Sequence, residues 1–480
     1  MNQSKHFDFL RSALTLENPF MPTETLVSWM KAKNEEVVVN INPMPLEKLR
    51  LWHFDEATGD LVHDSGKFFS IIGIDIQTDW GNVPHWQQPI INQAEVGFLG
   101  FVVKKINGVL HFLMQAKIEP GNINYVQLSP TIQATKSNYT QVHKGKKPLY
   151  LEYFNGEKPV DVLVDQLQSE QGARFLRKRN RNVIVEVSGK EADELPEYDN
   201  FCWLTLGQIK YLLQHDNLIN MDTRTVISCI AYGSFSADIT DLYNTLQKSF
   251  GVKENPYMGF LTSGILGERQ LHNTDTIISW ITRLKSRYDL FVNRMPLKDV
   301  QKWTRDDMSI FHEEGKYFSV IGVEVEIGNR EVQTWCQPLV KSSQEGIIAY
   351  IVKRINGVYH FLVQAKLESG NFDIIELAPT VQCLTGNYRA GLNEYTVPFL
   401  DIILSAKKEQ IIFDAFQSEE GGRFFREQNR NIIMEVGDEF GTEVPDNYIW
   451  MTLEQILTFI KFNNFLNVEA RSLISAIRFA

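Results

Sequence analysis

Hydrophobic and polar positions follow the same order in two parts of the chain. Residues 111–119, with the sequence HFLMQAKIE, return as HFLVQAKLE at residues 360–368. The offset of 249 residues (360 − 111 = 249) holds without a gap from His63 to Arg181, and this period is too long for a solenoid repeat. The pattern therefore predicts two tandem copies of one domain, in which charged and polar residues are copied together with the scaffold.

The spacing of apolar residues predicts a β-hairpin in each copy. Residues 98–106 and 109–118 are rich in β-forming residues and flank Asn107-Gly108, a pair that supplies the positive φ angles of a type I′ turn. Asn356-Gly357 repeats the signal in the second copy. We expect this hairpin to form the centre of an antiparallel-rich sheet.

Other segments predict helices that pack against this sheet. Residues 160–181 have helical spacing, and residues 182–187 return to a strand pattern. Thr205 is placed as the N-cap of a helix over residues 206–215. Together with the hairpins, these patterns predict two α+β domains.

The repeat divides the chain into four segments. Each copy begins with an amphipathic helix, near Thr25 and near Thr274, and the residues before the first helix are mixed in character and loop-like. The stretch between the copies has no matching partner at the end of the second copy, and its Gly and Pro breaks predict helix fragments and a linker. We expect an N-terminal arm at 1–24, repeat one at 25–220, a connector at 221–273 and repeat two at 274–480.

Composition narrows the class of protein. The chain has 480 residues, which fits two domains, and its 43% hydrophobic and 22% charged residues are ordinary for a globular protein. A net charge of −11 argues against a nucleic-acid or anionic-membrane surface. No apolar run approaches the roughly 18 residues of a membrane span. The four cysteines lie far apart and are expected to be reduced thiols of a cytoplasmic protein.

The second hairpin strand carries the first candidate site. Because side chains alternate faces along a strand, one face presents a set of mainly polar residues that the second copy keeps in the same order. A lysine and a glutamate two residues apart tune each other's charge state and can supply a base and an electrophilic partner. A solvated strand face is the alternative. The set comprises His111, Gln115, Lys117 and Glu119, with His360, Gln364, Lys366 and Glu368 in the second copy.

A group of arginines forms the second candidate site. Arg174, Arg177 and Arg181 have the spacing i, i+3, i+7 of one helical face, and Arg423, Arg426 and Arg430 repeat it. Guanidinium groups bind pyrophosphate or carboxylate in a bidentate manner, which favours an anion clamp. The alternative is a salt-bridged surface that involves Glu170, Glu419 and Glu420.

Further shared positions are less specific. Gly121-Asn122 is typical of a turn, Asn138-Tyr139 and its counterpart Tyr388 are either site or packing residues, and Trp86 either stacks on a ligand or belongs to the core. The chain has no phosphate-binding loop, no dinucleotide-binding glycine motif and no zinc-ligand spacing. The default expectation is a site without metal or cofactor.

Several stretches resemble one known family, the nucleotide-diphosphohexose 2,3-dehydratases of deoxysugar biosynthesis. The resemblance covers nearly the whole chain, and its motifs are HDSGKFFS at 63–70, LMQAKIEPGN at 113–122, QLSPTIQATKSNY at 127–139, LQSEQGARFLRKRNRN at 167–182, MDTRT at 221–225 and EEGGRF at 419–424. It implies a duplicated Nudix-hydrolase-like fold, a homodimer and a thymidine-diphosphate (dTDP) 4-keto-6-deoxyhexose as substrate. The paired glutamates of the Nudix metal signature are missing, and the segment from Arg174 to Arg181 stands in their place.

The family chemistry requires a base, a donor for an enolate oxygen and an acid, and it requires no redox cofactor. We assign Glu119 as base, Lys117 as enolate stabiliser and Tyr139 or His111 as proton donor, although a buried neutral Lys117 is an equal candidate for the base. The resemblance also raises the possibility of coupling to a sugar 3-ketoreductase.

For substrate binding we assign Gln115, Asn122, Asn138, Trp86, Arg174, Arg177 and Arg181. The first copy is favoured as the active pocket because its polar set is denser. The second pocket comprises Gln364, Lys366, Glu368, Tyr388, Arg423, Arg426 and Arg430, as a vestigial or regulatory nucleotide site. The competing functions are a non-catalytic sugar-nucleotide-binding protein and a metal-dependent Nudix-type pyrophosphohydrolase.

Overall fold

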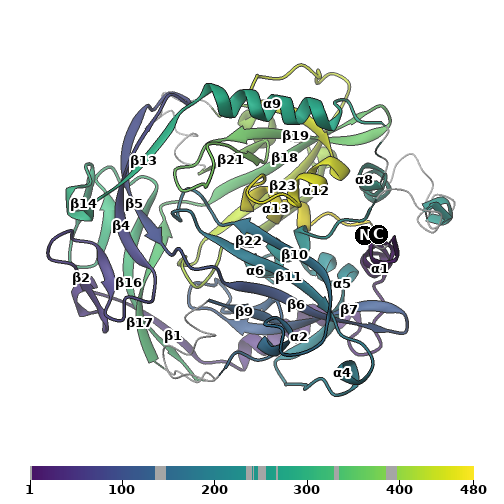
Figure 1. Ribbon diagram of the computed structural model, residues 1–480, viewed down its shortest axis with the longest axis horizontal. Helices are drawn as coiled ribbons and strands as arrows, with labels where there is room; N and C mark the ends of the chain where they lie inside the picture. The colour runs from purple at the N-terminus through teal and green to yellow at the C-terminus, as the bar shows by residue number, and fades with distance from the viewer. Residues whose placement is uncertain are drawn as a thin grey trace.

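The computed structural model describes residues 3–135, 147–233, 240–241, 243–246, 256–265, 267, 269–328, 334–384 and 397–479. It confirms the α+β class. The strands form two seven-stranded sheets and two five-stranded sheets. In Figure 1 the smaller sheets lie together at the left, and the larger sheets occupy the centre and right.

The two larger sheets have the same strand order. In the first, the order is β10-β11-β6-β7-β12, with β8 beside β7 and β9 beside β6; in the second it is β22-β23-β18-β19-β24, with β20 beside β19 and β21 beside β18. Each contains one parallel pair, β11 with β6 and β23 with β18, among antiparallel pairs. The strands of the first sheet are β6 (Phe98–Ile106), β7 (Val109–Ile118), β8 (Val126–Ser129), β9 (Ile132–Ala134), β10 (Asp161–Ser169), β11 (Arg179–Glu186) and β12 (Phe201–Thr205). Those of the second are β18 (Gly346–Ile355), β19 (Val358–Lys366), β20 (Glu376–Ala378), β21 (Val381–Leu384), β22 (Ile411–Ser418), β23 (Gln428–Val436) and β24 (Tyr448–Thr452).

The predicted hairpins are confirmed at the centre of both sheets. β6 pairs with β7 and β18 pairs with β19. Asn107 and Gly108 have φ angles of 52° and 78°, and Asn356 and Gly357 have 53° and 80°, as a type I′ turn requires. Alternation along β7 buries Phe112, Met114, Ala116 and Ile118 in the main core, as the sequence predicts.

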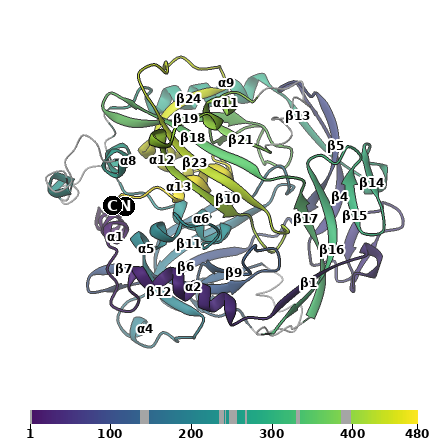
Figure 2. The same ribbon diagram turned by 180° about the vertical axis from the view of Figure 1, so that it is seen from behind.

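The two smaller sheets are built by exchange of strands between the repeats. β1, which precedes the first hairpin, pairs with β16 of the second half, and β13 of the second half pairs with β4 of the first. Figures 1 and 2 show these long connections crossing between the two halves. One sheet contains β1 (Val39–Met44), β14 (Trp303–Arg305), β15 (Ser309–His312), β16 (Phe318–Ile327) and β17 (Thr334–Ser342). The other contains β2 (Trp52–Phe54), β3 (Leu61–His63), β4 (Ser70–Thr78), β5 (His85–Asn92) and β13 (Leu290–Met295).

The predicted helix over residues 160–181 is wrong. The segment forms strand β10, a loop over residues 170–178 and the start of β11. β10 pairs with β11 along its length, apart from a bulge between Val162 and Val164, so sheet pairing overrides the local helical spacing. The arginines in this stretch therefore do not share a helical face.

The N-terminal arm and the connector are also more ordered than the sequence indicated. Residues 3–14 form helix α1, not a loop, and α8 in the connector is its counterpart. Ser12 Oγ donates to Leu110 O and accepts from Leu206 N, while Ser263 Oγ donates to Tyr359 O and accepts from Leu453 N. The start of the connector, too, has a partner, because α6 with its cap Asn220 matches α13 with its cap Asn467.

The remaining helices cover the larger sheets. Thr205 caps α5 in a capping box with Gln208, as predicted, and Thr452 does the same for α12 with Gln455. Buried residues of the helices and of both larger sheets form one main core. The α-helices are α1 (Gln3–Leu14), α2 (Leu26–Glu35), α4 (Lys190–Asp193), α5 (Leu206–Leu212), α6 (Met221–Ser228), α8 (Pro256–Ile265), α9 (Thr274–Arg287), α11 (Leu400–Leu404), α12 (Leu453–Ile460) and α13 (Val468–Ser475).

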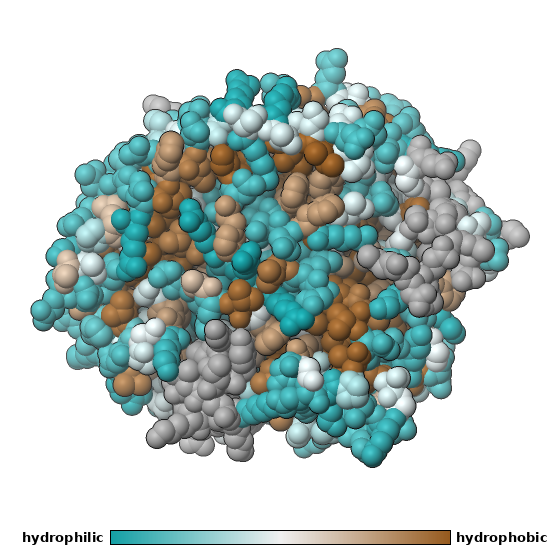
Figure 3. Space-filling view, viewed as in Figure 1, coloured by the Kyte–Doolittle hydropathy of each residue, from teal (hydrophilic) through white to brown (hydrophobic). Residues whose placement is uncertain are grey.

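On the surface, hydrophilic residues form most of the face in Figure 3, and hydrophobic residues gather in separate patches between them. Among the described residues, no helix is long and apolar enough to cross a membrane.

Candidate active site

Two loops from opposite repeats interlock beside each predicted Lys-Glu pair. Gly121 N donates to Gly421 O at 2.7 Å, and Arg426 N donates to Gly121 O at 2.7 Å. The mirror contacts join Gly370 N to Gly172 O at 2.6 Å and Arg177 N to Gly370 O at 2.7 Å. We call the polar cluster around Lys117 and Glu119 the first pocket and the cluster around Lys366 and Glu368 the second pocket. Each is built by one repeat and completed by the other, an arrangement that the sequence comparison did not predict.

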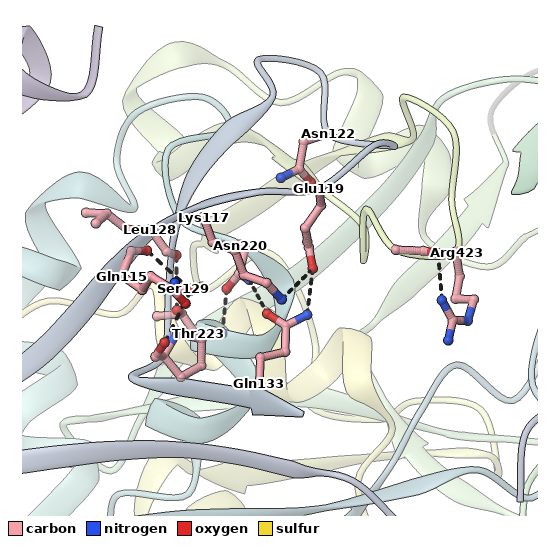
Figure 4. A network of polar contacts seen from close by, with 12 residues as sticks. Gln115, Lys117, Glu119, Asn122, Leu128, Ser129, Gln133, Asn220, Thr223 and Arg423 are labelled. Carbon is pink, nitrogen blue, oxygen red and sulfur yellow. Dashed lines mark hydrogen bonds and ion pairs between the residues drawn. The ribbon is translucent and has the colours of Figure 1, made fainter. Parts of the chain in front are cut away.

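In the first pocket a chain of polar side chains ends at Glu119. Lys117 Nζ donates to Glu119 Oε1 at 3.2 Å, and Gln133 Nε2 donates to the same oxygen at 2.6 Å. Asn220 Nδ2 then donates to Gln133 Oε1 at 3.1 Å. Figure 4 shows these side chains converging from β7, β9 and the start of α6. The lysine side chain is 15% exposed and the glutamate 5%, so the pair is largely screened from water.

The cap of helix α6 fixes the direction of this chain. Asn220 Oδ1 accepts from Thr223 N at 2.9 Å, so the amide nitrogen of Asn220 must face Gln133. The Gln133 amide in turn must present its nitrogen to Glu119. The second repeat has the same order of donors, in which Asn467 donates to Gln382 at 2.7 Å and Gln382 donates to Glu368 at 3.0 Å.

Further charged groups surround Glu119 and Lys117. Asp222, in the first turn of α6, is 3% exposed, and burial together with Glu420, Glu170 and Glu119 raises its pKa well above the ordinary range. Burial raises the pKa of Glu420 to about 7, with Arg423 and Lys117 opposing and Glu119 and Glu170 adding to the shift. The first pocket thus contains Lys117, Lys178 and Arg423 beside Glu119, Glu170, Asp222 and Glu420.

The arginine that accompanies the first pocket comes from the second repeat. The Arg423 guanidinium lies over the Phe69 ring at 4.2 Å, and its Nε donates to Gln93 Oε1 at 3.1 Å. Figure 4 shows Arg423 to the right of Glu119, on the loop from the opposite repeat. Stacking and the Gln93 bond hold the guanidinium in one orientation.

The structure does not bring the three arginines of the predicted clamp together. Arg174 lies over Phe318 at 4.4 Å and interacts electrostatically with second-pocket residues Glu368, Glu419 and Glu427. The Arg177 side chain is exposed, and its backbone φ is 47°. Arg181 forms a two-pronged surface salt bridge with Asp165, through bonds of 2.7 and 2.6 Å. The predicted second-copy set separates in the same way, because Arg430 pairs with Asp414 and the Arg426 side chain is exposed.

The second pocket keeps the layout but not the charges. Lys366 Nζ donates to Gln382 O at 2.9 Å. Gln127 of the first repeat, opposite Lys117 in the sheet, is replaced by Glu376, which is opposite Lys366. Lys178 is likewise replaced by Glu427. The second pocket thus contains Lys366 and Arg174 beside Glu368, Glu376, Glu419, Glu427 and Glu469. The buried Arg224 and Arg471 each interact with acidic residues of both pockets, so they do not distinguish one pocket from the other.

The other predicted site residues lie in different surroundings. His111 is 2% exposed, and its Nδ1 forms a hydrogen bond with Val109 O at 2.9 Å. It lies six positions before Lys117 on the same strand, which is a distance of roughly 20 Å. Asn122 is buried beside Glu119, and Gln115 lies two residues before Lys117. Trp86 bonds to Gln88, which donates to Ala173 O, so Trp86 lies by the Arg174 loop. Asn138, Tyr139 and Tyr388 lie outside the described residues.

Several residues of the first pocket were missed from the sequence, among them Gln133, Asn220 and Glu420. Gln133 has an identical counterpart, Gln382, at the same offset of 249 residues, so a closer comparison of the copies would have found it. Asn220 matches Asn467 only after a change of register. Glu420 stands where the first repeat has Gln171, so a search for shared residues passes over it.

Comparison with known proteins finds one family over nearly the whole chain. A model of the NDP-hexose 2,3-dehydratase family matches residues 23–230 and 274–477. A dTDP-4-dehydro-6-deoxy-alpha-D-glucopyranose 2,3-dehydratase of Saccharopolyspora spinosa is 45% identical over 469 residues, which are 98% of this chain and 94% of that protein. A protein with the same description from Amycolatopsis orientalis is 42% identical over 474 residues, which are 98% of this chain and 93% of that protein. Another from Streptomyces violaceoruber is 41% identical over 454 residues, which are 94% of this chain and 96% of that protein.

The chain therefore belongs to the NDP-hexose 2,3-dehydratase family. The resemblance and the expected enzyme class, a carbon–oxygen hydro-lyase, are confirmed.

Proposed function

We propose that this protein removes the carbon-2 hydroxyl of dTDP-4-keto-6-deoxy-D-glucose by β-elimination and that the reaction takes place in the first pocket. The carrying observation is that the chain aligns over nearly its full length with relatives described as dehydratases of this substrate. The screened Lys117–Glu119 pair gives the first pocket a carboxylate next to an ammonium group, as the chemistry requires.

The chemistry follows from the acidity of carbon 3. The neighbouring carbonyl acidifies the hydrogen on carbon 3, and its removal gives an enolate on the carbon-4 oxygen. The carbon-2 hydroxyl then leaves, and the resulting enol tautomerises to dTDP-3,4-diketo-2,6-dideoxyglucose. Only water is lost. In this proposal Glu119 is the base, and Lys117 stabilises the enolate oxygen.

Charge supports the first pocket as the active one. The substrate carries an anionic diphosphate, and the first pocket has three cationic side chains, Lys117, Lys178 and Arg423. The second pocket has glutamates in place of Gln127 and Lys178, which disfavours an anion there. Arg423, held by Phe69 and Gln93, is the proposed partner of the diphosphate.

Further parts of the proposal concern the fold and the assembly. The matching order of the two larger sheets supports two Nudix-hydrolase-like repeats, within the matched ranges 23–230 and 274–477, of which the first includes α6. The absence of the paired-glutamate signature disfavours the pyrophosphohydrolase alternative. We also propose that the protein is a cytoplasmic homodimer. It would work together with a sugar 3-ketoreductase, because the 3,4-diketo product is reactive and suits prompt reduction.

The test is an incubation of the purified protein with dTDP-4-keto-6-deoxyglucose in deuterated water with EDTA, followed by NMR. Loss of the carbon-2 hydroxyl with deuterium incorporated at that carbon is the expected result. Intact sugar with broadened lines would instead indicate a binding protein. Conversion only after Mg²⁺ is added, with release of nucleoside monophosphate, would indicate a hydrolase.

A further inference from the structure

Two adjacent residues in each interlocking loop face different pockets. In the first-repeat loop, Glu170 belongs to the first pocket, where it accepts from Asn180 Nδ2 at 2.6 Å, while Gln171 donates to Glu419 of the second pocket. In the second-repeat loop, Glu419 belongs to the second pocket and Glu420 to the first. Each pocket therefore receives one side chain from the loop of the opposite repeat. In the first pocket this is the carboxyl group of Glu420, and in the second it is the amide of Gln171.

Backbone contacts place Glu420 against the reacting end of the first pocket. Gly421, the next residue, accepts a hydrogen bond from Gly121 N, and Gly121 lies two residues after Glu119. A Cβ atom at Gly421 would lie 2.2 Å from Asn122 Oδ1, so the two loops are in close contact here. The Glu420 side chain stays partly exposed, unlike the buried Glu119. Glu420 is thus partly accessible and partly buried, and its burial is large enough to raise its pKa.

We propose that Glu420 is the catalytic acid that protonates the departing carbon-2 hydroxyl, supplied to the first pocket by the second repeat. This inference rests on the proposed dehydratase function. It divides the chemistry between the repeats, because the base Glu119 and the enolate stabiliser Lys117 come from the first repeat. It also predicts that the second pocket does not catalyse the elimination, since the Gln171 amide has no acidic proton to give.

The proton inventory of the reaction balances with these three residues. Glu119 takes the hydrogen of carbon 3, and the electron pair of that bond forms the enolate beside Lys117. The carbon-4 carbonyl then re-forms as the bond between carbon 2 and oxygen breaks, and Glu420 gives its proton to the leaving oxygen, which departs as water. Glu420 is left as a carboxylate and Glu119 as a carboxylic acid. Tautomerisation then moves two protons: carbon 2 takes one from Glu119 or from solvent, and the carbon-3 hydroxyl gives one up, which restores the Glu420 carboxylic acid directly or through solvent.

The electrostatics of the pocket keep a substantial fraction of Glu420 protonated at neutral pH. Burial raises its pKa to about 7, and the carboxylates of Glu119 and Glu170 act in the same direction. Arg423 and Lys117 oppose this shift, and Asp222 and Lys178 also interact with Glu420. A group with a pKa near the working pH is the most effective general acid.

The leaving group offers a test that a structural role would not mimic. Fluoride departs without a full proton transfer, so a 2-deoxy-2-fluoro analogue of the 4-keto substrate makes elimination far less dependent on the acid. In Glu420→Gln we expect loss of water to slow by about 10²–10⁴-fold. Fluoride release, followed by ¹⁹F NMR, should stay within about tenfold of the wild-type rate. Exchange of the carbon-3 hydrogen with deuterated water should persist, because Glu119 is intact.

The controls separate the possible failures. Glu443→Gln, which neutralises an exposed glutamate before β24, should leave all three rates unchanged. Equal slowing of water loss and fluoride release in Glu420→Gln would overturn the assignment. The assignment would also be overturned if Asp222→Asn selectively lost water elimination while Glu420→Gln kept normal turnover, because Asp222 would then be the acid. A wild-type protein that eliminates neither group would contradict the proposed function itself.

Discussion

Gly121 and Phe424 belong to opposite repeats, and a Cβ atom at residue 121 would lie only 1.6 Å from the Phe424 carbonyl oxygen. The mirror pair is Gly370 with Phe175, where the distance would be 1.8 Å. Both clashes are with backbone, which cannot rotate away as a flexible side chain would. The interlock that completes each pocket therefore requires glycine at both positions.

We expect Gly121→Ala to destabilise the protein by about 1–3 kcal/mol or more, because the interlocked loops must separate to admit a methyl group. It should also lower turnover, since the displaced loop carries Glu420 and Arg423. Urea denaturation monitored by circular dichroism, together with steady-state kinetics, tests both effects. Gly267→Ala is the control, because among the described residues no atom beyond its own chain neighbours lies within 4 Å of a Cβ there. Equal stability of Gly121→Ala and the wild type would contradict the steric argument.

The duplicated Lys-Glu pair allows each pocket to be disabled separately. We expect Lys117→Ala and Glu119→Gln each to lower kcat by about 100-fold or more, because they remove the enolate stabiliser and the base. The matched variants Lys366→Ala and Glu368→Gln should keep most of the turnover. Affinity for dTDP, measured by calorimetry, should change by only a few fold in the first two variants. If Glu368→Gln loses as much activity as Glu119→Gln, the second pocket is catalytic as well.

Local sequence signals predicted those elements whose structure depends on near neighbours. Asn107-Gly108 specifies its turn because it alone determines two positive φ angles, and Thr205 specifies a helix start through contacts within one turn. The duplication also identified the Lys117–Glu119 pair. These predictions needed no knowledge of where the two repeats lie relative to each other.

What the sequence did not predict depends on contacts between the repeats. The apolar spacing of residues 160–181 fits a helix in isolation, but β11 pairs with both β10 and β6, and this pairing determines the outcome. The offset of 249 residues likewise suggested that Arg174 serves the same pocket as Glu119. Exchange of loops places Arg423 there instead, and no comparison of one copy with the other reports such an exchange.

Because Arg423 of the second repeat lies in the first pocket, we predict that it binds the diphosphate there, whereas the sequence alone predicted arginines of the first repeat. We expect Arg423→Ala to weaken dTDP affinity and raise KM by about 10–100-fold, the loss typical of a charge-assisted contact of about 1.5–3 kcal/mol. Arg423→Lys should recover only part of the affinity, because lysine lacks the planar fork. Isothermal titration with dTDP and steady-state kinetics measure both effects.

Arg181→Ala is the comparison that decides between the two arrangements. Its salt bridge with Asp165 is exposed, with 36% and 40% of the two side chains accessible, so its loss should leave KM nearly unchanged. A loss of dTDP affinity in Arg181→Ala as large as in Arg423→Ala would restore the three-arginine clamp.

Glu376 gives a prediction about pH that leaves the catalytic residues untouched. Its side chain is 1% exposed, accepts from Ser169 Oγ at 2.8 Å, and has its pKa raised by burial from 4.5 to about 8. The folded state therefore holds this proton more tightly than the unfolded state does. The stabilising contribution is complete below about pH 4.5, declines as the pH rises and is lost above about pH 8.

We therefore expect Glu376→Gln to match the wild type at pH 5 and to exceed its free energy of unfolding at pH 9, by on the order of 1–4 kcal/mol. Glutamine is the residue that the first repeat has at this position, and Gln127 Oε1 accepts from Ser418 Oγ at 2.8 Å, so the replacement can keep the corresponding bond to Ser169. Urea denaturation at pH 5, 7 and 9 measures the difference. The reciprocal Gln127→Glu change should lower stability most at pH 9, because it adds a buried carboxylate where the wild type has a neutral amide. A stability difference between Glu376→Gln and the wild type that stays constant across this range would mean that Glu376 is ionised in the folded protein throughout.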